Sequence, residues 1–520
     1  MNDDQTAQIL QNLPRRICDI VEPWAQRSPD RIALVEASGR WTYSELASAI
    51  ATARDLLRQW GIRQGDRVML VCENCRAYAA FLLALAGLDA WPVLVNARLA
   101  PPEVDQILEL SGARRVIYTV GASPLARKHA ARHGAQTHES SQWSSIAVGP
   151  LCETVQPEPL EGDPASRVAV LIYTSGTTGR PKGVMLSHRN LLFMAAASSH
   201  IRSVSSDDRL LGVLPMSHAV GLAVVLLGTL IAGGTVVLAA HFDPAAALET
   251  LENERVTILL GTPAMFSLLV EYAGWKGLRA LRFPSLRVIS SSGAPLPLAL
   301  KTQVEALFGM VLHNGYGVTE CSPTIALTRL DSPRTDTSVG QVFPATQVKF
   351  VDPQGREVAH GEVGELWVCG PNVMKGYYRA PQETAAAINS EGWFNTRDLA
   401  RMEDDHLFIV GRTKDLIVRS GFNVYPAEVE AVLNAHPAVA RSAVIGRQVA
   451  GDEEIIAFVQ PRPNCSLETQ ELAKHAAQNL APYKHPSRYV PVPELPITPT
   501  GKVSKDALLQ ILASAPVAPR

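Results

Sequence analysis

Short apolar runs alternate with longer amphipathic stretches over residues 44–292. The runs are rich in β-branched residues and predict buried strands at 67–72, 91–96, 115–120, 168–173, 235–240, 256–261 and 286–292. The stretches between them have the apolar spacing of helices, for example at 44–60 and 244–254. Strands that alternate with helices in this way favour α/β layers with largely parallel sheets.

The pattern changes after about residue 340. Strand-like runs at 347–352, 364–370 and 407–412 are separated by turn residues, which predicts an antiparallel or barrel-like section. Beyond this section the order helix, strand, strand, helix predicts a separate α+β unit with its own core. We therefore expect a large α/β domain with a β-barrel-like part at 1–411 and a smaller α+β domain at 412–520.

Two segments depart from the alternation. Residues 121–166 are polar and rich in Ala, Ser, His and Pro, so we expect irregular surface structure there. Residues 221–240 carry no charge and approach the length of a membrane span. Because Gly233 and Gly234 divide this run into a helix-like and a strand-like half, a buried helix, a turn and a buried strand are favoured over a membrane helix.

Composition narrows the classes of protein. The chain has 520 residues, of which 47% are apolar and 19% charged, with a net charge of −2. These values are typical of a globular protein of two or more domains, and they give no basic excess for nucleic acid or an anionic membrane. The acidic N-terminus lacks the apolar core of a secretory signal, and SAPVAPR at the C-terminus is not a peroxisomal address.

Cysteine usage agrees with a cytoplasmic location, which we expect for this chain. The 7 cysteines are scattered, which favours reduced thiols. Cys72 and Cys75 form a CxxC pair, but no second pair of ligands follows at similar spacing. A metal site at this pair is therefore disfavoured.

The most polar loop of the chain, YTSGTTGRPKG at 173–183, directly follows a predicted buried strand. Its glycines allow close approach of the backbone, and successive N–H groups in such a loop can hold an anion. Lys182 adds a point charge suited to phosphate. The loop is neither a Walker loop, because Arg-Pro separates Gly179 from Lys182, nor a GxGxxG fingerprint. It predicts a phosphate site of another kind.

This loop resembles the phosphate loop of the adenylate-forming (AMP-binding) superfamily, which contains acyl-CoA synthetases, firefly luciferase and the adenylation domains of nonribosomal peptide synthetases. Further similar segments follow in the family's order: PMSHAVGL (215–222), SSGAPL (291–296), NGYGVTE (314–320), WFNTRD (393–398), GRTKDLIVRSGFNVYPAEVE (411–430) and LPITPTGKVSKDAL (495–508). The chain is most similar to the acid–CoA ligase branch. This resemblance implies that a carboxylate attacks the α-phosphate of ATP to give acyl-AMP and pyrophosphate, and that the thiol of CoA then displaces AMP.

The resemblance also implies a set of ATP-binding residues. The β- and γ-phosphates would be held by the loop residues Thr174, Ser175, Gly176, Thr177, Thr178, Gly179 and Lys182. The adenine would lie between two segments, Ser292, Gly293, Ala294 and Pro295 on one side and Asn314, Gly315, Tyr316 and Gly317 on the other, with Tyr316 stacked on the base. Thr319 would contact the α-phosphate, and Glu320 with Thr178 would hold Mg²⁺.

Residues near the C-terminus complete the implied site. Asp398 would accept hydrogen bonds from both ribose hydroxyls, assisted by Arg412. Lys502 would reach the carboxylate and the α-phosphate and stabilise the charge that develops there. One residue departs from the family, since Arg397 stands where glycine usually precedes the ribose aspartate.

The family also implies a moving C-terminal domain. Lys414 matches the hinge about which this domain rotates between the two half-reactions. After the rotation Lys502 leaves, and the segment with Arg419 and Gly421 faces the active site, where Gly421 lets the pantetheine arm of CoA pass. The small domain is therefore expected to be mobile.

The segments expected to line the acid pocket limit the substrate. His218 would lie between nucleotide and acid, although a histidine satisfied within the core is the alternative. MSHAVGL lacks the aspartate that pairs with an amino-acid ammonium, and the walls at 214–225, 262–268, 290–296 and 314–325 contain no Lys or Arg for a second carboxylate. An apolar tail is favoured by Ala219, Val220, Gly221, Met265, Phe266, Val318 and Ile325. Fatty and aromatic acids remain open.

Two other functions are alternatives to the ligase. An acyl-AMP ligase that loads a carrier protein is disfavoured because no carrier domain is attached. A non-catalytic nucleotide-binding protein is disfavoured because Lys182, Glu320, Asp398 and Lys502 are all present. The expected partners are thus ATP, Mg²⁺, CoA and a carboxylic acid, with no nucleic acid and no membrane span, in a monomer or a homodimer.

Overall fold

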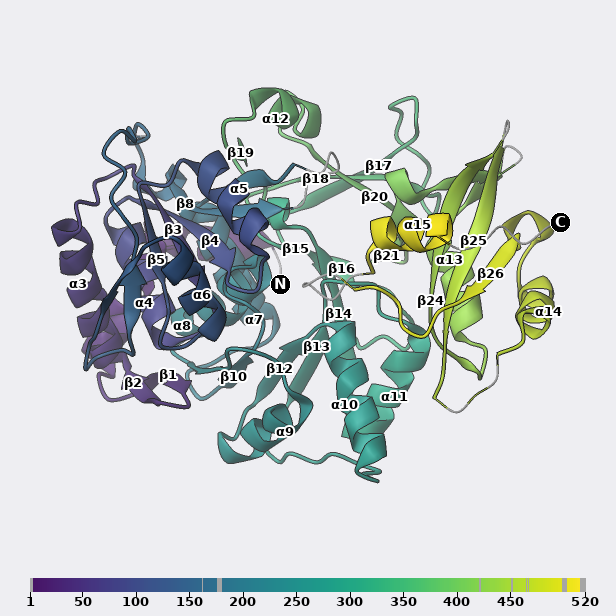
Figure 1. Ribbon diagram of the computed structural model, residues 1–520, viewed down its shortest axis with the longest axis horizontal. Helices are drawn as coiled ribbons and strands as arrows, with labels where there is room; N and C mark the ends of the chain where they lie inside the picture. Colours follow the sequence, from purple (N-terminus) through teal and green to yellow (C-terminus); the bar gives the residue numbers. More distant parts are fainter. Residues whose placement is uncertain are drawn as a thin grey trace.

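The computed structural model describes residues 3–160, 162–174, 180–419, 422–449, 452–463, 465, 467–497 and 503–514. Figure 1 shows a large N-terminal part, built on two sheets, and a C-terminal part at the other end of the long axis. The predicted α/β class is confirmed, with strands that begin and end within a few residues of their predicted positions.

The first large sheet has eight strands in the order β19-β9-β8-β4-β3-β5-β7-β6. These are β3 (Arg67–Cys72), β4 (Trp91–Asn96), β5 (Arg115–Tyr118), β6 (Gln136–His138), β7 (Ile146–Val148), β8 (Val168–Thr174), β9 (Lys182–Ser187) and β19 (Gly376–Tyr377). The central strands β8, β4, β3 and β5 run parallel.

The second large sheet has nine strands in the order β16-β15-β14-β13-β12-β10-β11-β1-β2. These are β1 (Ile32–Glu36), β2 (Gly39–Thr42), β10 (Arg209–Gly212), β11 (Thr235–Leu238), β12 (Ile258–Gly261), β13 (Val288–Ser291), β14 (Leu312–Gly317), β15 (Thr324–Leu327) and β16 (Gln341–Val342). Strands from β1 to β14 pair in parallel.

Both sheets are covered by helices on both faces, which explains why their strands are apolar throughout. Along β3, Val68 and Leu70 join the central hydrophobic cluster, whereas Met69 and Val71 face a second cluster. The helices between the sheets are α3 (Tyr43–Gln59), α4 (Arg76–Gly87), α7 (His188–Ile201), the π-helix η3 (Val220–Leu227) and α8 (Gly228–Ile231). Outside lie α5 (Pro101–Ser111) and α6 (Pro124–Arg132) on the first sheet, and α9 (Pro244–Asn253), α10 (Pro263–Trp275) and α11 (Leu298–Phe308) on the second.

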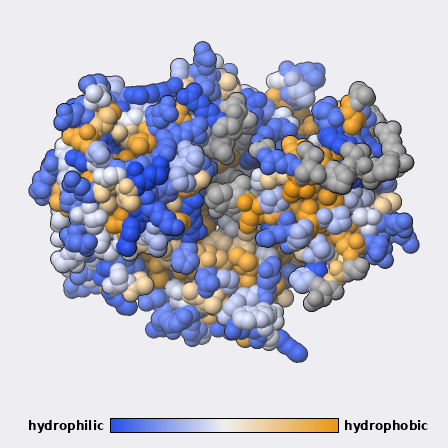
Figure 2. Space-filling view, in the orientation of Figure 1, coloured by the Kyte–Doolittle hydropathy of each residue, from blue (hydrophilic) through white to orange (hydrophobic). Residues whose placement is uncertain are grey.

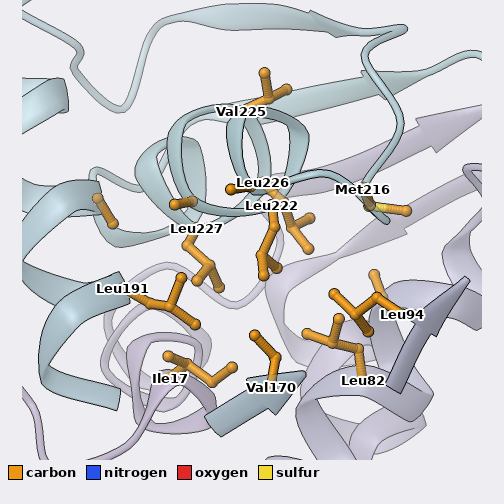
Figure 3. Packing of buried hydrophobic residues seen from close by; sticks show 14 of the residues in the cluster. Ile17, Leu82, Leu94, Val170, Leu191, Met216, Leu222, Val225, Leu226 and Leu227 are labelled. Atoms are coloured by element: carbon orange, nitrogen blue, oxygen red, sulfur yellow. The ribbon is translucent and has the colours of Figure 1, made fainter. Parts of the chain in front are cut away.

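The uncharged run at 221–240 divides as predicted. Helices η3 and α8 end before Gly233, whose φ of +79° turns the chain into β11. The helix is a π-helix, however, and Figure 3 shows Leu222, Leu226 and Leu227 directed toward Val170 of β8 and Leu191 of α7. Within the described residues, no helix is both long and apolar enough to cross a membrane.

The expectation of irregular structure at 121–166 was wrong. Ser123 accepts a hydrogen bond from the N–H of Ala126 and begins α6. Strand β7 pairs with β5 and β6, which extends the first sheet. Trp143 is buried against Phe81, at 5.2 Å between ring centroids. These strands are three residues each, so the pairing of β7 with β5 and of β6 with β7, and not their own sequence pattern, defines them.

The section after residue 340 is a four-stranded antiparallel sheet in the order β17-β18-β20-β21. Its strands are β17 (Gln347–Val351), β18 (Gly364–Cys369), β20 (Phe394–Glu403) and β21 (His406–Arg412), and α12 (Pro381–Ala387) precedes β20. The predicted antiparallel pairing is thus observed. The strand β20 carries Asp398 and faces β21, which carries Arg412.

The C-terminal part has its own hydrophobic clusters, formed by residues from Ile417 onward. It contains η5 (Thr413–Asp415), β22 (Ile417–Arg419), β23 (Phe422–Val424), α13 (Pro426–Asn434), β24 (Val439–Val449), β25 (Asp452–Pro461), α14 (Thr469–Asn479), β26 (Arg488–Pro491) and α15 (Lys505–Ser514). Figure 2 shows apolar side chains gathered on the right of the molecule, where this part lies. The boundary at 411/412 stays a prediction, which the separate clusters support.

Candidate active site

The candidate site lies where parallel strands of both sheets end. The carboxyl ends of parallel strands meet at one edge of a sheet, which is where α/β proteins bind ligands. Strand β8 ends at Thr174, and Ser291 at the end of β13 pairs with Asn314 of β14. The two segments expected to hold the adenine, one directly after β13 and the other on β14 itself, therefore lie side by side. The loop residues Ser175, Gly176, Thr177, Thr178 and Gly179 lie outside the described residues.

Asp398 lies at the centre of a first polar cluster. It is 3% exposed, and its two carboxylate oxygens accept separate hydrogen bonds, from Arg412 Nε at 2.9 Å and from the hydroxyl of Tyr316. Burial and the negative charge of Asp398 raise the pKa of Tyr316, so its hydroxyl stays a donor. The three residues expected at the base and the ribose of ATP are thus in direct contact.

Glu320 forms a second polar cluster next to the first. It lies on the short helix η4 (Thr319–Cys321), and its Oε1 accepts a hydrogen bond from the hydroxyl of Tyr377 at 3.0 Å. Lys182 lies over the ring of the same tyrosine, with Nζ 5.1 Å from the ring centroid. Tyr377 therefore connects the expected metal ligand with the expected phosphate lysine. No sequence pattern indicates Tyr377, because the contact depends on the pairing of β19 with β9.

The surroundings of Glu320 suit a divalent cation. Burial raises the pKa of its carboxyl, while hydrogen bonds from its own backbone N–H and from Tyr377 oppose this effect. Glu320 is half-buried and has no ion pair among the described residues, so a cation that prefers oxygen ligands would offset its charge. The described residues hold no group of three or more His, Cys, Asp or Glu around a metal position. A single carboxylate with substrate phosphates is the usual arrangement for Mg²⁺.

The expected adenine-binding segment is fixed by backbone contacts. Asn314 donates from Nδ2 to the carbonyl oxygens of Thr337 and Ser338, both at 3.2 Å. At Gly317 a Cβ atom would lie 1.8 Å from the carbonyl oxygen of Pro323, so only glycine fits. On the opposite segment Gly293 has a φ of +86°, with Ser292 and Ala294 half-buried and Pro295 exposed.

Arg397 occupies a backbone conformation that favours glycine. Its φ is +61°, in the left-handed region, and its N–H donates to Asn395 Oδ1 at 2.8 Å. Its side chain points away from Asp398 and donates to the carbonyl oxygen of Ala386, at the end of α12. Arginine at position 397 therefore leaves the Asp398 cluster intact, and the strain falls on the backbone of residue 397.

We expect Arg397→Gly to be more stable than Arg397→Ala by about 1 kcal/mol in the free energy of unfolding. Both variants lose the bond to Ala386, but only alanine keeps a Cβ atom at a positive φ. Chemical denaturation of the two variants measures the difference. Equal stability would show that position 397 is not strained.

The hinge and the CoA-facing segment are only partly described. Lys414 is exposed on η5, whose neighbours Thr413 and Asp415 bind Glu365 at 2.8 Å and Lys505 at 3.0 Å. The guanidinium of Arg419 donates to the carbonyl oxygen of His485 within the C-terminal part. Gly421 and Lys502 lie outside the described residues. The roles of these residues stay predictions.

The expected acid-pocket residues do not all lie together. His218 is half-buried on the segment that joins β10 to η3, and its N–H donates to the carbonyl oxygen of Pro215 at 2.9 Å. Phe266 packs instead in the cluster that α9 and α11 form on the outer face of the second sheet. Ile325 is fully buried in the central cluster, whereas Met265 and Val318 are half-buried at its border.

Comparisons with known proteins agree with this site. The model of the AMP-binding enzyme family matches residues 21–378, and that of the AMP-binding enzyme C-terminal domain matches 428–502. A feruloyl-CoA synthase of Amycolatopsis sp. is 36% identical over 92% of this chain and 96% of its own length. The 4-coumarate–CoA ligase 3 of Oryza sativa subsp. japonica is 32% identical over 92% and 88%.

Solved structures agree with the sequence comparisons. ATP-bound MatB from Rhodopseudomonas palustris superimposes with a TM-score of 0.82 at 28% identity, covering 96% of this chain and 99% of that one. The superposition spans both the large sheets and the C-terminal part. The chain belongs to the AMP-binding enzyme family, in the acid–CoA ligase branch of the adenylate-forming superfamily.

Proposed function

We propose that the protein is an ATP-dependent acid–CoA ligase for a monocarboxylic acid with an aromatic tail. It forms the acyl-AMP with release of pyrophosphate, and then transfers the acyl group to CoA with release of AMP. The observation that carries this proposal is the pair of adjacent clusters, Tyr316–Asp398–Arg412 and Lys182–Tyr377–Glu320. One cluster suits a ribose and the other suits a metal-bound polyphosphate.

Each cluster has a chemical task in the first half-reaction. Asp398 offers the ribose hydroxyls a carboxylate that Arg412 and Tyr316 already hold in place. Lys182 supplies positive charge for the phosphates, with Tyr377 fixing the carboxylate of Glu320 beside it. Mg²⁺, held by Glu320 and Thr178, would neutralise phosphate charge when bound.

The aromatic acid is supported by two arguments. The relatives at 36% and 32% identity are named for ferulate and 4-coumarate, both aromatic acids. The segments 214–225, 290–296 and 314–325 contain no Lys or Arg, so a second buried carboxylate would have no partner there. Half-buried Met265, Val220 and Val318 instead offer apolar surface.

Thioester formation requires the C-terminal part to move. Lys502 belongs to the first half-reaction, and the segment with Arg419 and Gly421 belongs to the second. Each side of the hinge has its own tie, because Thr413 binds Glu365 of the large part and Asp415 pairs with Lys505 of the C-terminal part. Lys414 lies between these two ties and is itself exposed.

The experiment is pyrophosphate release from ATP and Mg²⁺ across a panel of acids, with and without CoA. The panel comprises cinnamates, benzoates, short and long fatty acids, malonate and amino acids. Release with cinnamates or benzoates, followed by a thioester when CoA is present, is the expected result. Release with fatty acids alone would overturn the aromatic substrate. Release without any thioester would favour transfer to a carrier protein.

A further inference from the structure

The turn that follows β3 holds the segment that carries His218. The turn is Glu73-Asn74, between the end of β3 and the start of α4. Asn74 is 5% exposed and makes three hydrogen bonds to the backbone of the other large sheet. Nδ2 donates to the carbonyl oxygens of Gly212 and Leu214, both at 2.9 Å, and Oδ1 accepts from the N–H of Met216 at 2.8 Å.

The segment from Gly212 to His218 has further backbone hydrogen bonds, since Gly212 accepts from the N–H of Ala239 at 3.1 Å and Pro215 accepts from the N–H of His218 at 2.9 Å. Strand β10 ends at Gly212, so Leu214 and Met216 have no neighbouring strand with which to pair. The hydroxyl of Ser217 is buried without a hydrogen-bond partner, so it contributes no tie either. Buried backbone groups need partners, and one asparagine amide supplies two donors and one acceptor at once.

The opposite side of the segment is packed against the π-helix. At Gly221 a Cβ atom would lie 2.2 Å from the carbonyl oxygen of Pro215 and 2.6 Å from that of Leu214. Figure 3 shows Met216 beside η3, at the border of the central cluster. The backbone at 214–216 is thus held between Asn74 on one side and Gly221 on the other.

The turn with Asn74 is itself rigidly placed. Cys75 caps α4 through its sulfur, which accepts from the N–H of Tyr78 at 3.4 Å. Glu73 pairs with Arg98 at 2.8 Å, and Arg98 donates to the carbonyl oxygen of Ala240 after β11. Cys72 and Cys75 flank this turn, which connects the carboxyl ends of the two sheets. Both cysteines are free and buried.

We propose that Asn74 is a positioning residue for the acid substrate: it fixes the backbone at 212–216, and thereby His218 and the mouth of the acid pocket. The proposal rests on the proposed function. Asn74 would act through the backbone that it holds and not by contact with the substrate. Its effect should fall on the acid and not on ATP, because its three bonds all go to the segment before η3.

The chain offers a matched control. Asn190 is 7% exposed and makes the same three kinds of bond, from Nδ2 to the carbonyl oxygens of Pro371 and Val373 and from the N–H of Ser187 to Oδ1. The segment it holds leads to Met374, whose N–H donates to the carbonyl oxygen of Glu320. Asn190→Ala therefore removes an equivalent buried amide on the side of the metal and the phosphates.

The test compares Asn74→Ala with Asn190→Ala in pyrophosphate release by the full chain. We expect Asn74→Ala to raise the KM for the acid about 10-fold or more and to change the ranking of acids, with the KM for ATP unchanged. Asn190→Ala should raise the KM for ATP and Mg²⁺ and leave the ranking of acids unchanged. Equal effects of Asn74→Ala on both KM values, or a lower Tm alone, would overturn the proposal.

Hydrogen exchange gives a readout that does not depend on turnover. Faster exchange confined to residues 210–222 is expected in Asn74→Ala, and exchange at 370–376 should not change. Unchanged exchange at 210–222 would overturn the proposal that Asn74 fixes this backbone. A wild-type protein that releases no pyrophosphate with any acid would refute the proposed function, while exchange would still decide the role of Asn74. If Asn74→Ala does not fold, Asn74→Asp keeps the acceptor for the N–H of Met216, removes the two donors to Gly212 and Leu214, and should give the same acid-specific change.

Discussion

Replacing Glu320 by glutamine is expected to lower kcat/KM for acyl-adenylate formation by about 10²- to 10³-fold, the range for loss of one preorganised group that stabilises developing charge. The substitution keeps the shape of the side chain and removes the buried charge that a Mg²⁺ ion would neutralise. Pyrophosphate release at varied Mg²⁺ measures the effect. A Glu320→Gln enzyme with wild-type Mg²⁺ dependence would remove Glu320 from the metal site.

Further substitutions test whether the effect comes from the charge of Glu320 or from the residues around it. Glu109 is exposed on α5, and Glu109→Gln makes the same chemical change with no expected loss. Tyr377→Phe removes the hydroxyl that donates to Glu320 and should raise the Mg²⁺ requirement about 10-fold. In Tyr378→Phe the lost hydroxyl donates to Glu158 instead, at 2.6 Å, so the Mg²⁺ requirement should not change.

Replacing Lys502 by alanine is expected to divide the two half-reactions. Formation of acyl-AMP should fall about 10²- to 10³-fold, because the ammonium would stabilise charge only in the adenylating transition state. Thioester formation from supplied acyl-AMP should be largely spared, because Lys502 would have left the site by then. The two rates are measured separately, with ATP and acid or with acyl-AMP and CoA. Equal loss in both would refute the assigned role.

The motif residues and the order of elements could be predicted from the sequence. The strands β3 and β4 occupy the predicted residues, and α3 begins within one residue of its prediction because Thr42 and Glu45 form a capping box. Local signals of this kind act over a few residues and are legible without the fold. The phosphate-loop motif and Asp398, the expected ribose ligand, could be identified for the same reason.

Contacts between distant segments could not be predicted. Tyr377 reaches Glu320 only because β19 pairs with β9, nearly two hundred positions earlier in the chain. The hairpin of β6 and β7 was missed because its strands are short and only the pairing of β7 with β5 attaches it to the sheet. Phe266 was expected in the acid pocket but packs on the outer face of the second sheet. The elements that pack against a helix decide which of its residues face the core.

The sequence by itself determined the fold class and the family, and it predicted residues for an ATP site, because these depend on local patterns and on motif order. The tertiary structure alone decided which side chains hold them in place. Asn74 is an ordinary polar residue in a CxxC turn until the second sheet brings Gly212, Leu214 and Met216 within hydrogen-bond distance. The physical reason is that buried backbone groups must be paired, and their partners come from whichever segment the fold places beside them.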